Sequence, residues 1–374
     1  MTGKKVEFLY LNEPDVIAAG ALDMGKCVRV IDEAFQLIGQ GDYLMGGPRE
    51  NEHGQMIWFP NEKRTPKMPV AGPDRRFMSM IAYLGGRFHV CGCKWYGSNI
   101  ANPKNGLPRS ILTITLNDPE TAEPLAFLSG NLISAMRTGA VPGVAAKYLA
   151  KPDAKVVGII GCGVINRACL LAIAKTQQNL QEVKLYDLFE EKAVAFAREM
   201  SEKLDMSIQP VSSLEEAVID ADIISIAAAG QQKVAIRSEW LKEGSLLTLT
   251  GAAELDEAFY LQTRIVADNW KMHQAWLNDA LEHPAGIESI QQVAPTAQLL
   301  KLVVEDKVEQ KRIENLGDIV TGRIRGRTNP DERILFVTGG LPVWDVAWAY
   351  IVYQEAIKQN LGQKLTLWDE PYWF

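Results

Sequence analysis

The spacing of hydrophobic positions changes near residue 130 and divides the chain into two patterns. Before the change, an apolar run at 6–11 predicts a strand. Residues 23–41 repeat apolar positions every three to four residues, which predicts a helix that Asp23 can cap and Gly41 can end. After the change, strands and helices alternate, and this alternation predicts a parallel sheet with right-handed crossovers.

The first third of the chain is predicted to form an antiparallel meander. Residues 42–76 are rich in Gly, Pro and charge, and we expect loops with short strands there. Three strands joined by short turns follow, at 87–98, 110–118 and 123–130.

The second pattern begins with a helix at 131–150, in which a break is expected before Pro142. Strands are predicted at 155–160, 182–186, 222–228, 245–250 and 264–267. Helices are predicted at 164–175, 190–204, 213–219 and 270–282. The final part, 313–374, is predicted as helix, loop, strand and helix.

Composition narrows the classes of function. A chain of 374 residues favours two domains. A net charge of −7 argues against a nucleic-acid partner, which favours a basic surface. Cys91 and Cys93 do not have zinc-site spacing and the four histidines are scattered, so no metal site is predicted. No segment has the length of a membrane span or the pattern of a signal peptide, so a cytoplasmic protein without a membrane partner is expected.

The stretch "VVGIIGCGVINRACLLAIAK" combines a strand, two glycines and an apolar helix, the context of a dinucleotide-binding loop. Gly161 allows the tight turn, and Gly163 lets the backbone approach a pyrophosphate at the start of the helix, where Val164 and Ile165 lie. Asn166 occupies the third fingerprint position, where Gly or Ala is usual. Its side chain can tolerate close packing or bind a phosphate oxygen.

Asp187 ends the next strand, where an acid accepts hydrogen bonds from a ribose and repels a 2′-phosphate. The cofactor predicted is therefore NAD. Ala228 and Ala229 end a later strand, and their small side chains let a flat cofactor lie close to the chain. The alternative is a glycine-rich turn in a domain that binds no nucleotide.

Lys94 lies in an otherwise apolar strand, on the same face as Val90 and Gly92. An inward lysine is costly unless it is paired, so it is either functional or an edge residue whose amine reaches water. Arg49 and Arg137, taken alone, are typical of surface or salt-bridge arginines. The charged stretch "DRRF" (74–77) is typical of a solvated loop.

Two long stretches resemble the ornithine cyclodeaminase/μ-crystallin family. The first is "GLPRSILTITLNDPETAEPLAFLSGNLISAMRTGAVPGVAAKYLAKPDAKVVGIIGCGVIN", and the second is "GDIVTGRIRGRTNPDERILFVTGGLPVWDVAWAYIVYQEA". The segments "GGPRENEHG", "AGPDRRF" and "KWYGSN" are similar to a branch named as the second subunit of tyramine oxidase.

The resemblance implies an α/β fold in which a Rossmann-type parallel-sheet domain (131–312) is inserted in an α+β substrate-binding and dimerisation domain (1–130 plus 313–374) with an antiparallel sheet. It also implies an NAD-bound homodimer. Its substrate is a small amino or imino acid, whose carboxylate is held by the cations that match Arg49, Lys94 and Arg137. A clamp of three cations suits a carboxylate, because arginine can bind it through two hydrogen bonds. Thr138 and Gly251 join the residues expected to bind the cofactor.

One departure from the family pattern concerns the acid–base group. The family places an aspartate after the fifth strand of the nucleotide domain, where this chain has Ala253. Glu254 follows and is the local candidate for a catalytic carboxylate beside Lys94, the other catalytic candidate. The alternative for Glu254 is a solvent-facing residue at the start of a helix.

Three functions follow from this pattern. The first is a cyclodeaminase-type enzyme that removes ammonia from a diamino acid and closes a ring, as in the conversion of L-ornithine to L-proline. The second is an NAD(H)-dependent imine reductase or an amino-acid or opine dehydrogenase. The third is a non-enzymatic binding protein or accessory subunit similar to μ-crystallin.

Overall fold

The computed structural model describes residues 3–228, 234–291 and 294–373. The chain forms two compact units and passes between them several times. The antiparallel unit comprises Met1–Asp23, Gly41–Ser134 and Leu341–Phe374, and the parallel unit comprises Met24–Gln40 and Ala135–Gly340.

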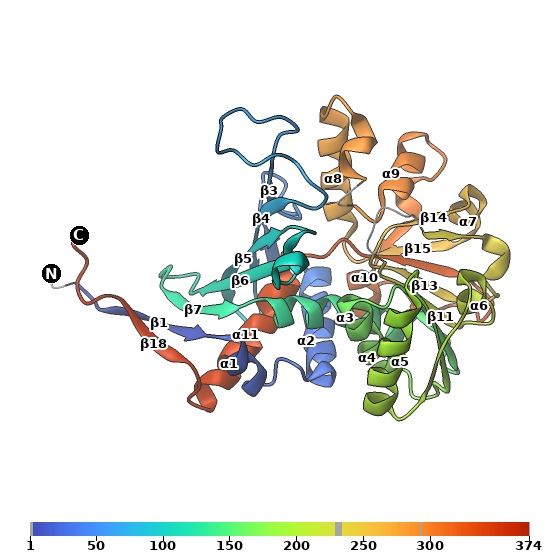
Figure 1. Ribbon diagram of the computed structural model, residues 1–374, viewed down its shortest axis with the longest axis horizontal. Helices are drawn as coiled ribbons and strands as arrows, with labels where there is room; N and C mark the ends of the chain where they lie inside the picture. Colours follow the sequence, from blue (N-terminus) through green and yellow to red (C-terminus); the bar gives the residue numbers. More distant parts are fainter. Residues whose placement is uncertain (1–2, 229–233, 292–293, 374) are drawn as a thin grey trace. The chain divides into compact units, whose positions relative to one another are not determined.

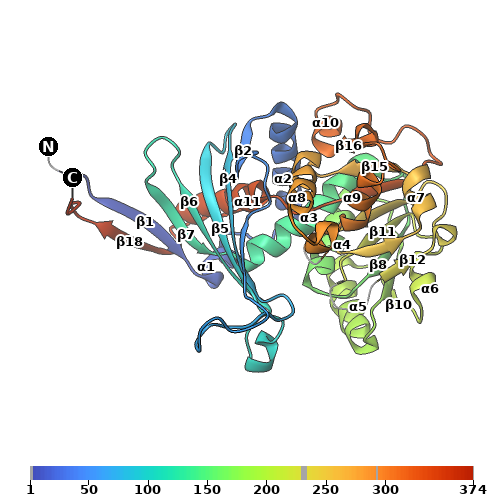
Figure 2. The same ribbon diagram turned by 90° about the horizontal axis from the view of Figure 1, so that it is seen from above.

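The antiparallel unit is a curved sheet with a long helix against one face (Figures 1 and 2). The strand order is β18-β1-β7-β6-β5-β4-β2, with β3 also paired to β4, and every pair is antiparallel except β1 with β7. The strands are β1 (Val6–Leu11), β2 (Tyr43–Met45), β3 (Gln55–Trp58), β4 (Arg76–Leu84), β5 (Val90–Ser98), β6 (Ser110–Asn117), β7 (Pro124–Ser129) and β18 (Gln363–Trp368). The helices are α1 (Glu13–Ala18), the 3₁₀ turn η1 (Asn102–Asn105) and α11 (Pro342–Lys358).

Side-chain alternation gives this sheet two different faces. On β4, Met78, Met80 and Leu84 are buried on the face that α11 covers. Phe77 and Ile81 lie on the opposite face and are exposed. Because apolar residues occupy both faces of β4, its sequence shows no alternation of apolar and polar positions. The sequence analysis therefore did not predict this strand.

The parallel unit is built on a second eight-stranded sheet, of order β10-β9-β8-β11-β13-β17-β15-β16, in which every pair is parallel. Its strands are β8 (Val156–Ile160), β9 (Glu182–Tyr186), β10 (Ser207–Pro210), β11 (Ile223–Ile226), β13 (Leu246–Leu249), β15 (Arg264–Ala267), β16 (Ile313–Asn315) and β17 (Ile334–Val337); β12 (Val234–Ile236) and β14 (Ala253–Leu255) form a separate pair. Its α-helices are α2 (Met24–Gln40), α3 (Asn131–Leu149), α4 (Val164–Thr176), α5 (Glu190–Leu204), α6 (Leu214–Val218), α7 (Glu257–Gln262), α8 (Trp270–Glu282), α9 (Ala297–Val304) and α10 (Leu316–Val320). The first turn of α3 belongs to the antiparallel unit. The 3₁₀ turns of the parallel unit are η2 (Ser238–Trp240), η3 (Gly286–Ile290) and η4 (Gln310–Arg312). The predicted α/β fold class, with one parallel and one largely antiparallel sheet, is confirmed.

The predicted break before Pro142 is wrong, because α3 runs through this residue without interruption. Gly139 and Gly143 lie on the face of α3 that packs against α4. A Cβ at Gly139 would come within 2.4 Å of the Ala168 Cβ, and one at Gly143 within 2.6 Å of the Ala172 Cβ. Proline removes one backbone hydrogen bond of a helix, and α3 nevertheless continues to Leu149 while packed against α4.

The predicted domain ranges, 131–312 and 1–130 plus 313–374, stay a prediction. By their contacts, residues 24–40 and 313–340 group with the parallel unit. The reason for the second range is visible in the sheet order, because β16 and β17 pair with β15 in the parallel sheet.

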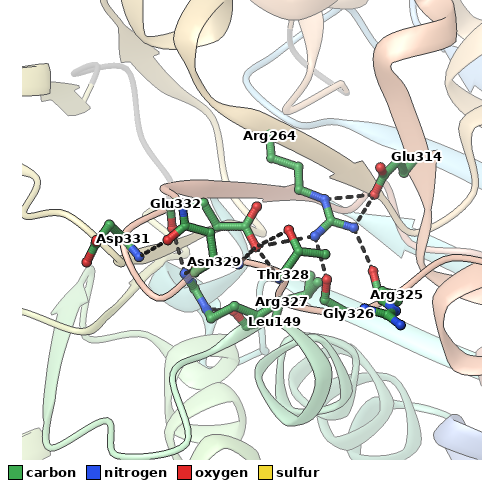
Figure 3. A network of polar contacts seen from close by, with 10 residues as sticks. All are labelled: Leu149, Arg264, Glu314, Arg325, Gly326, Arg327, Thr328, Asn329, Asp331 and Glu332. Carbon is green, nitrogen blue, oxygen red and sulfur yellow. Dashed lines mark hydrogen bonds and ion pairs between the residues drawn. The ribbon is translucent and has the colours of Figure 1, made fainter.

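Two arginines hold the loop that leads from α10 to β17 (Figure 3). Arg264 binds Glu314 through two nitrogens, at 2.9 and 2.6 Å, and donates to the carbonyl oxygen of Arg325 at 2.7 Å. Arg327 donates to the carbonyl oxygens of Leu149 and Glu332 at 2.8 and 2.6 Å. The basic motif "GRIRGRTNPDER" thus supplies contacts within the parallel unit.

A buried acid–histidine pair, Asp268 and His273, lies just after the carboxyl end of β15. The Asp268 carboxylate is fully buried and lies 2.9 Å from His273 Nε2. It also accepts hydrogen bonds from the Thr338 hydroxyl at 2.8 Å and the Gly339 N–H at 2.9 Å. Complete burial alone would raise the pKa of Asp268, but the hydrogen bonds and the neighbouring His273 outweigh it and lower the pKa. This pair fixes the chain at residues 338–340, directly before it enters the antiparallel unit.

Candidate functional site

The turn after β8 requires glycine at Gly161. Its φ is +88°, in the left-handed region, and a Cβ there would lie 2.7 Å from the Ala228 Cα. The Gly161 N–H donates to the Tyr186 carbonyl oxygen at 2.9 Å. The turn is therefore held close to the ends of the neighbouring strands, as the fingerprint predicts.

Gly163 differs, because a Cβ there would meet nothing within 4 Å. The residue is the N-cap of the 13-residue helix α4, and it has no side chain to cap the first turn. The first N–H groups of a helix lack partners within the helix and attract anions. Open space at Gly163 beside the start of α4, where Val164 and Ile165 lie, therefore fits a pyrophosphate.

Asn166 uses its side chain inside the protein. It is fully buried, and its amide nitrogen lies 2.7 Å from the carbonyl oxygens of both Ile160 and Gly161. Its amide oxygen accepts a hydrogen bond from the Ser225 hydroxyl at 2.8 Å. Two roles were considered for the Asn166 side chain, close packing and binding of a phosphate oxygen. Its contacts are those of close packing, and its hydrogen bonds stabilise the turn.

Asp187 lies beside the loop at the end of β9. One carboxylate oxygen accepts a hydrogen bond from the Cys162 N–H at 2.8 Å, and the other accepts one from the Phe189 N–H at 3.0 Å. Cys162, between the two glycines, has its pKa raised to about 12 by burial and by the neighbouring Asp187, so it stays a neutral thiol. The loop thus fixes the orientation of an acid that can accept from ribose hydroxyls.

The other residues predicted to bind the cofactor belong to the same unit. Ala228 and Gly251 are in close contact, since a Cβ at Gly251 would lie 2.7 Å from the Ala228 carbonyl oxygen. Thr138 lies in α3 and is partly exposed. Ala229 lies outside the described residues.

Lys94 forms a buried ion pair that the sequence analysis did not predict. The lysine is 2% exposed in the central strand β5, and its Nζ lies 2.8 Å from Oδ2 of the fully buried Asp345 in α11. The amine also donates to the Ser134 hydroxyl at 3.2 Å. The edge-residue interpretation is wrong, because β5 is flanked by β4 and β6.

The other two predicted clamp residues lie in different units. Arg49 follows β2 and lies 3.6 Å from the carboxylate of Glu52, a buried residue that also accepts from Gln55. Arg137 is buried in the part of α3 that belongs to the parallel unit. Convergence of Arg49, Lys94 and Arg137 on one carboxylate stays a prediction.

The position of the missing family aspartate is apolar and buried. Ala253 and Leu255 point to the buried side of β14, and Glu254 between them is exposed. Glu254 is therefore a strand residue, not the first residue of a helix. Its role as an acid–base group stays a prediction.

Sequence reasoning also missed two acidic residues with structural partners, Asp345 and Asp268. Asp345 lies in a helix that is apolar around its circumference, so its burial has no periodic signal. Within the described part of the chain, no group of three or more His, Cys, Asp and Glu side chains is arranged to hold a metal ion. Among the same residues, no helix is both long and apolar enough to span a bilayer.

A model of the ornithine cyclodeaminase/mu-crystallin family matches residues 21–360. The chain belongs to this family. It is 30% identical to N-((2S)-2-amino-2-carboxyethyl)-L-glutamate dehydrogenase of Staphylococcus aureus, over 97% of this chain and 99% of that protein.

Two solved structures extend the comparison. An archaeal alanine dehydrogenase dimer with bound NAD has a TM-score of 0.78 and 26% identity, and the match covers 97% of this chain and 100% of that one. The Δ1-pyrroline-2-carboxylate reductase of Thermococcus litoralis, in complex with NADH and L-proline, has a TM-score of 0.76 and 28% identity, with 95% and 99% covered. The predicted family is confirmed, and the predicted cofactor is the one bound in both relatives.

Proposed function

We propose that the protein is an NAD(H)-dependent oxidoreductase that interconverts an imine and an amine at the carbon next to a carboxylate. Of the three functions considered from the sequence, this is the second. The observation that carries it is the combination of a well-formed dinucleotide loop with a buried Ala253 where the family has its acid–base aspartate. The names of the S. aureus, archaeal and T. litoralis relatives, two dehydrogenases and a reductase, support the same choice.

The parallel unit supplies the cofactor site in this proposal. Gly161 and Gly163 receive the pyrophosphate at the start of α4, and Asp187 accepts from the ribose. Bound NADH supplies a hydride. In the net reaction the C=N carbon gains that hydride, the nitrogen gains a proton, and NADH is oxidised to NAD⁺.

The antiparallel unit supplies Lys94 and Arg49, two of the three cations that hold the substrate in this proposal. Keeping an ammonium group buried is costly, and the Lys94 amine is held in place by Asp345 at 2.8 Å and the Ser134 hydroxyl at 3.2 Å. Lys94 therefore fits a role that needs positive charge away from water, where its attraction to a carboxylate is strong. We assign it to the substrate carboxylate, with Arg49 and Arg137, and to proton delivery to the nitrogen. Asp345 holds its amine in place.

A homodimer is part of the proposal. The sheet face opposite α11 carries exposed apolar side chains, among them Leu44, Ile57, Phe77, Ile81, Trp95 and Ile111. The rings of Phe77 and Trp95 stack with centroids 5.7 Å apart. Exposed apolar groups of this kind mark association surfaces. We assign this face to a second copy of the chain, as the archaeal relative is described as a dimer.

The reaction is tested by incubating the protein with NADH and imines formed from ammonia and a panel of 2-oxo acids, or with Δ1-pyrroline-2-carboxylate. Stoichiometric loss of NADH absorbance with formation of the amino acid supports the proposal. No change in absorbance with any of these imines, by protein that still binds NADH, contradicts it.

The cyclodeaminase reaction is the second candidate, because the exposed carboxylate of Glu254 lies one residue from the family's acid position. It predicts ammonia release from a diamino acid with catalytic NAD⁺ and no accumulation of NADH. The variant Glu254→Gln separates the two reactions: it abolishes the cyclodeaminase reaction and leaves imine reduction unchanged.

A further inference from the structure

Arg76, at the start of β4, lies between two aromatic rings. Its guanidinium carbon is 5.3 Å from the centre of the Trp58 ring and 5.5 Å from that of Tyr96. Trp58 faces Arg76 across the β3–β4 pair, and Tyr96 lies on β5. The Arg76 side chain is 14% exposed, so the interpretation of "DRRF" as a solvated loop is wrong for this residue.

The acid that accompanies Arg76 is shared. Asp74 lies 3.1 Å from Arg76 through one carboxylate oxygen, and its other oxygen lies 2.7 and 2.6 Å from two nitrogens of Arg109. The neighbouring Arg75 donates instead to the Val70 carbonyl oxygen at 2.9 Å. Two guanidinium groups, of Arg76 and Arg109, therefore share one carboxylate, and with Arg75 beside them the cluster keeps a surplus of positive charge.

Arg76 also has an unused donor. Its Nε is buried and has no hydrogen-bond partner within the residues described. A buried donor without a partner costs about 1–3 kcal/mol. A planar guanidinium with an unused N–H edge, stacked on aromatic rings, is well suited to bind a carboxylate through two hydrogen bonds.

The cluster and Lys94 share one face of the same sheet. Lys94, Tyr96 and Ser98 of β5 point to the face of the sheet that α11 covers. Arg76 of β4 pairs directly with Ser98 of β5, so its side chain lies on the same face. Lys94 and Ser98, the residue opposite Arg76, are four positions apart on β5, so their backbones are separated by roughly 13 Å. A molecule that contacts both residues must therefore extend along the strand, with its two carboxylates several bonds apart.

We propose that Arg76, supported by Asp74 and Arg109, binds a second carboxylate of the substrate. This inference rests on the proposed function, in which Lys94 receives the first carboxylate. It assigns the substrate class: an amino or imino acid whose side chain or N-substituent carries an additional acid. A second carboxylate would balance the surplus positive charge of the cluster and give the Nε of Arg76 an acceptor.

Binding tests the subsite without requiring turnover. NADH-loaded protein is titrated by calorimetry with glutarate, a dicarboxylate, and with butyrate, a monocarboxylate of similar length. We expect glutarate to bind at least tenfold more tightly, and Arg76→Gln to reduce its affinity to that of butyrate. Arg76→Lys keeps the charge and should retain part of the preference. Arg323→Gln, which changes an exposed arginine of the parallel unit, should have no effect.

Kinetics with 2-oxoglutarate and with 2-oxobutyrate, each with ammonia and NADH, give the second readout. Arg76→Gln should raise KM for the dicarboxylate by about 30-fold or more, the effect of losing a charged hydrogen-bonded pair, and leave kcat/KM for 2-oxobutyrate within twofold. Equal use of both oxo acids by the wild type, or an unchanged preference in folded Arg76→Gln, overturns the subsite. If no imine is reduced, the proposed function fails, and the glutarate titration still decides the subsite.

Discussion

The loop around Gly161 and the ion pair of Lys94 are encoded in the chain in different ways. The loop lies within 27 residues, from Gly161 to Asp187, and most of its hydrogen bonds join a backbone group to a side chain nearby in sequence. Lys94 and Asp345 are separated by 251 positions and meet only when α11 packs on the sheet. The proposed phosphate-binding loop is thus a local feature of the sequence, whereas the buried cation depends on the complete fold of its unit.

Asp345→Asn should have the largest effect, because it leaves the Lys94 ammonium buried without its acid. Removing one partner of a buried pair typically costs about 3–5 kcal/mol of the free energy of unfolding. Urea denaturation measures the loss. The double variant Lys94→Met/Asp345→Leu removes both charges and should be more stable than Asp345→Asn. If it is less stable, the cost does not come from the unpaired charge.

Asp268→Asn should have the second-largest effect, a loss of about 1–3 kcal/mol of the free energy of unfolding at neutral pH. The reason is that this change alters a buried acceptor of several hydrogen bonds. The pKa of Asp268 is lowered in the folded protein, so its ionised form stabilises the fold above the usual pKa of about 4. This contribution is lost as the pH falls below that value. Urea denaturation between pH 3 and 7 should show wild type and variant converging at the acid end. A constant difference across this range would contradict the assignment.

The two glycines of the loop should respond differently to alanine. Gly161→Ala forces a side chain into a left-handed conformation and against Ala228, which costs about 1–3 kcal/mol of stability. Gly163→Ala meets open space in the protein, so stability should change little. Its affinity for NADH should still fall roughly tenfold, or about 1.4 kcal/mol, because the methyl group occupies the approach of the pyrophosphate. Thermal unfolding and fluorescence titration with NADH measure the two effects separately.

Asp187→Ser should have the smallest effect on the fold and should alter the choice of cofactor. Loss of an acceptor for the ribose hydroxyls should weaken NADH binding about tenfold. Loss of the negative charge should improve the relative affinity for NADPH. Dissociation constants for both cofactors test this, and a variant that still prefers NADH by the wild-type ratio would remove Asp187 from cofactor selection.

Most of the parallel unit could be predicted from sequence, because its strands are short apolar runs between helical segments and its loop has a fixed spacing of glycines. The role of Asn166 could not be chosen from sequence, since packing and phosphate binding require the same small polar residue. Its contacts with Ile160, Gly161 and Ser225 became evident only with the turn and β11 in place.

The antiparallel unit was less predictable from sequence because its contacts, like the Lys94–Asp345 ion pair, join residues from separate segments of the chain. Strand β4 is apolar on both faces, and "DRRF" has the composition of a loop. The partners of Arg76 come from β3, β5 and the loops before β4 and β6. No spacing rule within one segment relates these residues to each other.

The position of α11 has a consequence for synthesis on the ribosome. Strands β1–β7 emerge early, but the helix that covers their buried face comes from the last tenth of the chain. Until residues 342–358 leave the exit tunnel, Lys94 has no Asp345 and the Met78–Leu84 face has no cover. The parallel unit, complete by residue 340, can fold first. If the parallel unit folds first, the nascent chain presents an apolar sheet face until α11 emerges, and surfaces of this kind are bound by chaperones.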